Sequence, residues 1–298
     1  MSTWTILGVG AIGGLMASQF HSAGIPFELV PRQQSSELPS HLSIEKQGQQ
    51  QSVPCRYHQK GTPISHLLLT TKSHQTKTAI DCVAEDIGTH SVIVVLQNGM
   101  GSAEYLADRF PQVTVLGATT THGAYRKDPY TIVHAGEGAT WFGPLNKDDT
   151  LVAKSIVEDW QAAGLAIEWD ANLKQRLWLK LGINCAINPL TVIHDCLNGE
   201  LLENPQALDS FKKVAKEFEA IYQALFGIYP SPPILLVVED VARKTAKNIS
   251  SMRQDVLNNR PTEIEAINGY LIKQATAMKI TCEENLRLYN AIKNIDSN

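Results

Sequence analysis

The sequence predicts an α/β fold in which a first domain, over residues 1–169, is followed by an all-α domain over residues 170–298. Two patterns support this prediction. The first half alternates short apolar runs with helical spacing, which is typical of a parallel sheet built from right-handed βαβ units. From about Asn172 onward the apolar residues recur with helical spacing.

Short apolar segments mark the strands of the first domain. The run Val92–Leu96 is continuous and largely β-branched, as expected for a strand buried on both faces. A helical pattern extends from Ile12 to His21. Further strands are predicted at Thr5–Leu7, Phe27–Val30, Leu67–Thr70, Val113–Leu116 and Thr131–Val133. We expect the last of these in an antiparallel extension of the sheet.

Helical patterns fill the second domain, and prolines separate several of them. Pro189 is expected to end the first helix, because proline lacks the N–H group that a helix interior requires. A proline-rich segment ending at Pro233 separates two further helices, and Pro261 precedes another. The predicted helices are Leu173–Ile187, Pro205–Phe226, Leu236–Val256, Glu263–Met278 and Glu283–Ile292.

Composition restricts the classes of function. The chain has 298 residues, a formal net charge of −4 and 43% hydrophobic residues, so it has ample core and no basic excess for nucleic-acid binding. Its five cysteines form no C-x-x-C pair, which is typical of reduced thiols in a cytosolic protein. No leader pattern and no membrane-spanning apolar stretch are found. We therefore expect a cytoplasmic protein that binds neither nucleic acid nor membrane.

A glycine-rich turn follows the first predicted strand and opens the first predicted helix. In the pattern G-x-G-x-x-G, the first glycine permits the tight turn, the second lets backbone approach a pyrophosphate, and the third lets helix pack on strand. The alternative is a purely structural turn, but the strand-turn-helix context favours a Rossmann-type dinucleotide site. The turn comprises Gly8, Val9, Gly10, Ala11, Ile12 and Gly13.

The end of the second strand discriminates between cofactors. Sites for NAD usually carry an acidic residue there, about 20 residues after the motif, to bind the ribose hydroxyls. Here Glu28 lies within the strand, and Arg32 follows it. The planar guanidinium of Arg32 suits a 2′-phosphate, although a loop arginine is often only a solvated charge. The sequence favours NADPH over NADH.

Polar residues follow two further strands. Lys72 ends the third predicted strand, and Asn98 lies in a Gln-Asn-Gly-Met-Gly segment after Val92–Leu96. Ligands in open α/β sheets bind beyond the carboxyl ends of the strands, so both residues are candidates for the cofactor region. Each segment alone is equally consistent with an ordinary polar turn.

An unusual polar stripe occupies the first helix of the second domain. Lys180, Asn184 and Asn188 recur every four residues and so share one helix face, while their neighbours are almost wholly apolar. Solvent-exposed faces normally use Glu, Lys, Gln and Arg, so we favour a lined cleft over a solvated face. A desolvated lysine has a lowered pKa, and Lys180 is therefore the candidate proton donor for carbonyl reduction.

A second polar stripe is predicted at Asn248, Ser251 and Asp255, spaced i, i+3 and i+7 on one helix. Glu263 begins the next helical pattern, where it either stabilises the helix N-terminus or contacts a ligand. The tripeptide His194-Asp195-Cys196 lacks further ligands at metal spacing, so we expect no metal.

Taken together, these segments resemble the ketopantoate reductase (2-dehydropantoate 2-reductase) family along nearly the whole chain. The glycine motif is common to many enzymes, whereas the lysine-asparagine helix followed by Ser-Ser-Met and Thr-Glu-Ile is far more specific. The matching segments begin at Gly8, Thr71, Gln97, Thr119, Lys180, Asn198, Asn248 and Thr262.

The resemblance implies NADPH-dependent reduction of 2-dehydropantoate to (R)-pantoate, a step toward pantothenate and coenzyme A, by a monomer or homodimer. It implies that Lys180 donates the proton. Other two-domain dehydrogenases, which more often use a histidine base, and a non-catalytic NADP(H) sensor are the alternatives. The implied substrate residues are Asn98, Asn184, Asn188, Asn198 and Ser251, and the implied cofactor residues beyond the glycine turn are Arg32, Lys72, Asn98, Ala124 and Glu263.

Overall fold

The structure, a computed structural model, describes residues 2–30 and 38–297. The chain divides into two compact units. Unit 1 comprises Met1–Gln97 and Ser102–Lys174, and unit 2 comprises Asn98–Gly101 and Gln175–Asn298. The short segment Asn98–Gly101 therefore packs with the helical unit, although it follows a strand of the α/β unit in sequence.

A seven-stranded sheet forms the centre of unit 1, in the order β11-β10-β7-β6-β5-β1-β2. All its pairs are parallel except β7 with β10, which is antiparallel. The α/β fold class is thus confirmed. The strands are β1 (Trp4–Leu7), β2 (Phe27–Val30), β5 (Ile64–Leu69), β6 (Ile87–Val95), β7 (Thr114–Thr120), β10 (Thr140–Pro144) and β11 (Glu168–Trp169).

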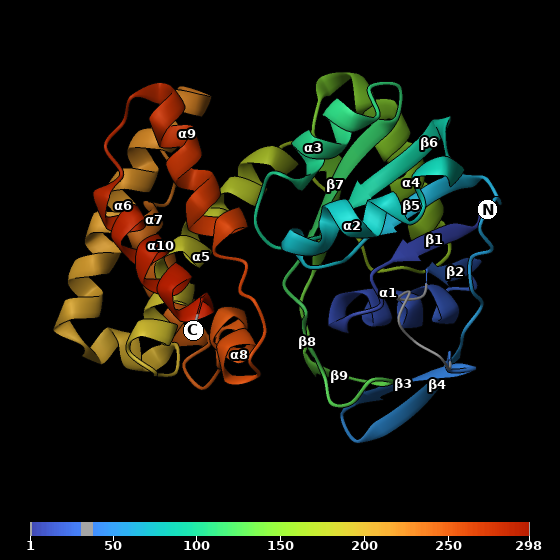
Figure 1. Cartoon of the computed structure of the whole chain (residues 1–298), viewed down its shortest axis with the longest axis horizontal. Helices are drawn as coiled ribbons and strands as arrows, with labels where there is room; N and C mark the ends of the chain where they lie inside the picture. Colours follow the sequence, from blue (N-terminus) through green and yellow to red (C-terminus); the bar gives the residue numbers. More distant parts are fainter. Residues whose placement is uncertain (1, 31–37, 298) are drawn as a thin grey trace. The chain divides into compact units, whose positions relative to one another are not determined.

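A smaller four-stranded sheet, in the order β4-β3-β9-β8, completes unit 1. Thr131–Val133 form a strand as expected, but its expected place is wrong, because it belongs to this smaller sheet and the antiparallel strand of the main sheet is β10. Helix α1 (Ala11–Ser22) contacts strands of both sheets and lies between them (Figure 1). The small-sheet strands are β3 (His41–Lys46), β4 (Gln49–Pro54), β8 (Gly123–Arg126) and β9 (Thr131–Gly136).

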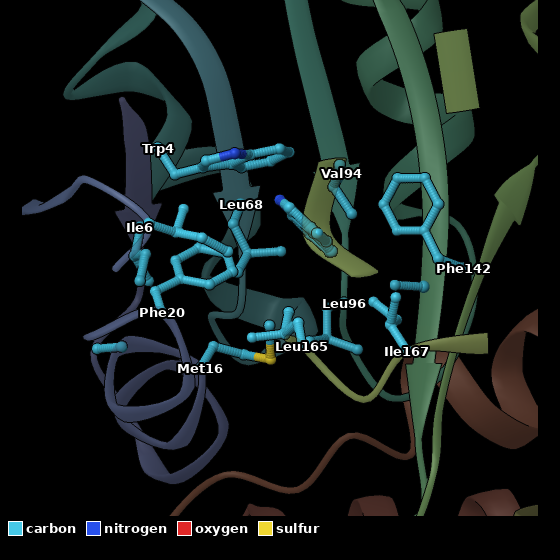
Figure 2. Packing of buried hydrophobic residues seen from close by; sticks show 14 of the residues in the cluster. Trp4, Ile6, Met16, Phe20, Leu68, Val94, Leu96, Phe142, Leu165 and Ile167 are labelled. Carbon is cyan, nitrogen blue, oxygen red and sulfur yellow. The ribbon is translucent and has the colours of Figure 1, made fainter. Parts of the chain in front are cut away.

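Aromatic side chains fill the core between α1, the main sheet and α4 (Thr150–Ala162). The ring centroid of Trp160 lies 4.7 Å from that of Trp4 and 5.3 Å from those of Phe20 and Phe142. Figure 2 shows Trp4, Phe20 and Phe142 among the aliphatic residues of the same cluster. This packing fixes α1 against β1, so the turn that joins them is held on both sides. The remaining helices of unit 1 are α2 (Thr76–Asp81) and α3 (Ser102–Arg109).

Unit 2 is helical, as predicted. Its longest helix, α6 (Pro205–Phe226), has the bounds that its local signals indicate. The Asn204 side chain caps its N-terminus, and Gly227 ends it with a φ of 70°. The other helices are α5 (Leu173–Ile193), α7 (Ile234–Lys244), α8 (Ser251–Leu257), α9 (Tyr270–Met278) and α10 (Glu283–Asp296), with a 3-10 turn η4 (Gly199–Glu203) and a π-helical turn η5 (Glu265–Gly269).

Two helix predictions are wrong. Pro189 lies inside α5 rather than ending it, and the predicted helix Leu236–Val256 is divided into α7 and α8 by residues 245–250. At the end of α7, the Thr245 hydroxyl shares the Val241 carbonyl with the Thr245 backbone nitrogen, and the Ser250 hydroxyl caps the start of α8, so local hydroxyl bonds stabilise both helix ends here. None of the described helices combines the length and the apolar character needed to cross a membrane.

Candidate functional site

The glycine turn of unit 1 has two glycines that the fold itself requires. Gly8 has a φ of +104°, and a Cβ there would lie 2.5 Å from the backbone nitrogen of Thr71. A Cβ on Gly13 would lie 2.2 Å from the carbonyl oxygen of Gly8. The Thr70 hydroxyl donates to that same carbonyl at 2.6 Å, which ties the turn to the end of β5.

Gly10 is different. Its φ of −86° suits any residue, and no described protein atom lies within 4 Å of the place a Cβ would take. It caps α1, whose first turn holds no acidic residue. The described fold does not require this glycine, whose bare backbone leaves room for a ligand, and the first N–H groups of a helix suit a pyrophosphate. The turn thus fits a dinucleotide; Val9, Ala11 and Ile12 are half-buried within it.

The acidic residue of the second strand is occupied by other partners. The Glu28 carboxylate accepts from the Thr5 hydroxyl at 2.9 Å and lies 2.6 Å from Nδ1 of His58. His58 also bonds Asp86 through Nε2 at 2.8 Å, so the imidazole joins two carboxylates. Burial alone would lower the pKa of His58, but the bonds and charges of Asp86 and Glu28 outweigh it and raise the pKa. Arg32 lies outside the described residues.

Polar groups meet where β5 ends beside β6. The Gln97 amide donates to the carbonyl of Thr71 at 2.8 Å and to the hydroxyl of Thr76 at 2.9 Å. These bonds hold the segment after β5 against the end of β6. Lys72 lies in this segment, half-buried and with extended backbone, directly before the 3-10 turn η1 (Ser73–Gln75).

The Asn98 segment is held within unit 2. The backbone nitrogen of Met100 donates to the carbonyl of Ala266 at 2.8 Å. Gly99 has a φ of +76°, and a Cβ there would lie 2.7 Å from that same carbonyl oxygen. The glycine is therefore required by the close approach of two backbones, and half-buried Asn98 is fixed next to the segment that carries Glu263.

Ala124 lies on β8 in the small sheet, opposite His134 on β9. A group beside it was missed in the sequence, because its members are dispersed: the ligand atoms of His122, His134 and Glu137 lie within 4.8 Å of one another. Nδ1 of His122 lies 3.1 Å from Nε2 of His134 and accepts from the backbone nitrogen of Gly138 at 3.0 Å. Because Nδ1 of His122 accepts and so carries no proton, Nε2–H of His134 is the donor between the two rings, and we interpret the group as a hydrogen-bonded histidine pair.

Helix α5 carries the predicted polar stripe. Lys180 and Asn184 are half-buried and Asn188 is buried, so the stripe is not a solvated face. Burial lowers the pKa of Lys180 to about 8, although the charge of Glu263, itself buried, acts in the opposite direction. An amine with this pKa is present in both protonation states near neutral pH, as a general acid requires.

The second predicted stripe does not form as one helix face. Asn248 precedes α8 and is exposed, and Ser251 is the exposed first residue of that helix. Asp255 is buried and pairs with Arg260 at 3.3 Å. The prediction failed because residues 245–250 leave the helical conformation.

Asn198 is hydrogen-bonded to the end of α7, and Ser250 is hydrogen-bonded to the last turns of α5. The Asn198 amide donates to the hydroxyl of Thr245 at 2.9 Å, and its buried Oδ1 has no hydrogen-bond partner among the described residues. Ser250, which the sequence analysis did not single out, bonds Thr191 at 2.6 Å, one turn beyond Asn188.

Comparisons with known proteins agree on one family. Two family models match, described as ketopantoate reductase PanE/ApbA over residues 4–147 and as its C-terminal part over residues 172–296. A 2-dehydropantoate 2-reductase of Vibrio cholerae is 34% identical, with 98% of this chain and 97% of that protein covered.

Solved structures have the same fold. A probable 2-dehydropantoate 2-reductase from Bacillus subtilis is 28% identical, with a TM-score of 0.83 over 99% of this chain and 100% of that one. A D-mandelate dehydrogenase in complex with NADH and anilino(oxo)acetate has a TM-score of 0.90 at 20% identity, over 99% of each chain, which shows the shared fold alone. The chain belongs to the ketopantoate reductase family.

Proposed function

We propose that this chain reduces 2-dehydropantoate to (R)-pantoate with NADPH, in the cytoplasm. The observation that carries the proposal is the stripe on α5, where a lysine whose pKa is about 8 shares a largely buried helix face with two asparagines. We assign cofactor binding to residues 1–169 and substrate binding to residues 170–298.

The glycine turn would hold the pyrophosphate. Its fit rests on Gly10, the one glycine of the motif that the described fold does not require. The preference for NADPH is supported by Glu28, whose carboxylate is already bound by Thr5 and His58 instead of being available for ribose hydroxyls. Arg32 and Lys72 would bind the 2′-phosphate, while Ala124 and Glu263 would contact the cofactor.

In the reaction, reduced nicotinamide would supply a hydride to the C2 carbonyl carbon. Lys180 would donate its proton to the carbonyl oxygen, so that no free alkoxide has to form. Asparagine amides both donate and accept hydrogen bonds, which suits the carboxylate and hydroxyls of the substrate. The residues assigned to substrate binding are Asn98, Asn184, Asn188, Asn198 and Ser251.

A matched pair of glycine variants tests the cofactor site. Gly10→Ala should leave stability unchanged or slightly higher, because the added methyl meets no described atom, yet weaken NADPH binding at least tenfold. Gly13→Ala should destabilise the protein by about 1–3 kcal/mol, because its Cβ would collide with the Gly8 carbonyl. Urea unfolding and NADPH fluorescence titration measure the two effects. Undiminished binding in Gly10→Ala would refute the assignment.

The pH dependence of turnover tests the proton donor. A general acid must be protonated, so kcat/KM should decline as the pH rises through about 8, the pKa of Lys180. Because the Glu263 charge raises this pKa, Glu263→Gln should move the decline to lower pH. Initial rates of NADPH oxidation between pH 6 and 10 give both profiles. A Glu263→Gln profile displaced to higher pH would contradict the assignment.

The cofactor choice is tested by steady-state kinetics with 2-dehydropantoate and either NADPH or NADH. We expect kcat/KM for NADPH to exceed that for NADH at least tenfold. Arg32→Ala should reduce this ratio while leaving the NADH value nearly unchanged, because only NADPH carries the 2′-phosphate. Equal use of both cofactors would overturn the NADPH assignment and leave the reductase assignment standing.

A further inference from the structure

Helix α5 continues through Pro189, and this leaves the backbone carbonyl four residues earlier, that of Cys185, without its usual helical donor. Proline has no N–H group, so the carbonyl of Cys185 receives no helical hydrogen bond from position 189. The side chain of Asn268 donates to this carbonyl at 3.1 Å. Asn268 has no exposed surface, and Cys185 is equally buried. A side chain 83 residues away thus supplies the bond that the proline removes.

The same amide is part of a longer buried chain. Asn268 also donates to Oδ1 of Asn285 at 2.9 Å, and Asn285 in turn donates to the Glu217 carboxylate at 2.7 Å. Glu217 accepts from the backbone nitrogens of Glu284 and Asn285, at 2.7 and 3.0 Å, and so caps α10. Asn268 is therefore fixed by α10 and α6 as well as by α5.

The segment 262–269 connects three groups of the proposed site. Glu263, near its start, acts electrostatically on Lys180. The carbonyl of Ala266 receives the Met100 nitrogen at 2.8 Å and so holds the segment that contains Asn98. Asn268, near its end, binds α5 between the levels of Asn184 and Asn188. At the other end, the Thr262 hydroxyl donates to Asp296 at 2.7 Å.

We propose that Asn268 is a positioning residue: it joins the segment 262–269 to the α5 carbonyl that Pro189 leaves without a helical donor, and it thereby sets the register of Glu263 and Asn98 against the Lys180–Asn188 stripe. The inference rests on the proposed function for its catalytic consequence. It requires no contact between Asn268 and substrate or cofactor.

Asn268→Ala should destabilise the protein and impair substrate use selectively. We expect the KM for 2-dehydropantoate to rise about tenfold and kcat to decline about threefold. The KM for NADPH should rise less, because the glycine turn and the other cofactor residues assigned to unit 1 are not held by Asn268, and only the cofactor contact of Glu263 is affected. Val214→Ala is the matched control: it truncates a buried side chain of α6 outside the network and should lower stability without this KM change.

A double-mutant cycle tests whether Asn268 positions the segment 262–269 or only supplies a hydrogen bond to the Cys185 carbonyl. In Pro189→Ala, position 189 regains an N–H group that can bond Cys185, so Asn268→Ala should cost less stability in this background, where only the loss of its bond to Asn285 remains. The segment would still be untethered, so the effect of Asn268→Ala on the KM for 2-dehydropantoate should stay about tenfold. Urea unfolding and steady-state kinetics of the four proteins give both couplings.

The outcomes are distinct. If the KM effect disappears together with the stability effect in the Pro189→Ala background, Asn268 only satisfies a carbonyl and the proposal is overturned. If the wild-type protein does not reduce 2-dehydropantoate, the proposed function fails, and hydrogen exchange then tests whether Asn268 holds the segment 262–269 on α5. In the double variant Asn268→Ala/Pro189→Ala, the backbone amides of residues 98–101 and 263–269 should exchange at least tenfold faster than in the single variant Pro189→Ala. Equal exchange rates would overturn the proposal that Asn268 positions these segments.

Discussion

Lys180→Ala is expected to lower kcat by about two to four orders of magnitude, the usual contribution of a positioned general acid. The physical reason is the carbonyl oxygen, which acquires negative charge as hydride arrives at carbon. Lys180 is half-buried, and burial brings its pKa to about 8, so it can give up its proton readily near neutral pH. The other lysine of α5, Lys174, is exposed.

The measurement is kcat at saturating NADPH and 2-dehydropantoate, together with the Kd for NADPH by fluorescence titration. The Kd should change less than threefold, because the proposed cofactor cradle lies on unit 1. Lys174→Ala is the matched control, since Lys174 is an exposed lysine on the same helix and should be dispensable. Wild-type turnover in Lys180→Ala would eliminate the lysine as proton donor.

His58→Gln is expected to destabilise the protein by about 3–5 kcal/mol, the typical cost of removing one partner from a buried ion pair. His58 lies between two carboxylates, at 2.6 Å from Glu28 and 2.8 Å from Asp86, and the side chains of His58 and Asp86 are both only 4% exposed. A neutral amide leaves the charge of both carboxylates uncompensated. Urea unfolding measures the change, and His90→Gln, at an exposed histidine of β6, is the control.

The destabilisation expected in His58→Gln depends on pH in a direction that the pKa shifts of His58 and Asp86 determine. The raised pKa of His58 means that its contribution is complete below about 6.5, its unfolded value, and is lost as the pH rises through the folded value. The hydrogen bond from His58 lowers the pKa of Asp86, whose contribution is present above about 3.9 and lost as the pH falls further. The stability difference between wild type and His58→Gln should therefore be largest between about pH 4 and 6.5. A difference that grows above pH 8 would contradict a charged His58.

Local signals predicted the elements whose ends are set by neighbouring residues. Helix α6 is an example: Asn204, Pro205 and Gly227 are cap residues that act within one turn. The continuation of α5 through Pro189 could not be predicted in this way, because the compensating donor, Asn268, is 83 residues away. Strand β10 was missed because its pairing partner, β7, rather than its own short Thr140–Pro144 pattern, defines it.

The candidate site likewise has features that local sequence predicts and features that depend on long-range contacts. The glycine turn lies within six consecutive residues and the Lys180–Asn184–Asn188 stripe within one helix, so sequence spacing alone placed the members of each together. The attachment of Asn98 to the helical unit depends on Ala266, and the pairing of Glu28 with His58 spans 30 residues. Such long-range bonds are invisible to periodicity, and they decide which polar residues remain available for a ligand.

The central claim is tested most directly by following hydride transfer to 2-dehydropantoate from NADPH that is deuterated at both C4 positions, beside a panel of aliphatic and aryl 2-oxo acids. The account predicts deuterium at C2 of (R)-pantoate, and a kcat/KM for 2-dehydropantoate at least a hundredfold above that of every other acid in the panel. No deuterium in pantoate, or a higher kcat/KM for another 2-oxo acid, would contradict it.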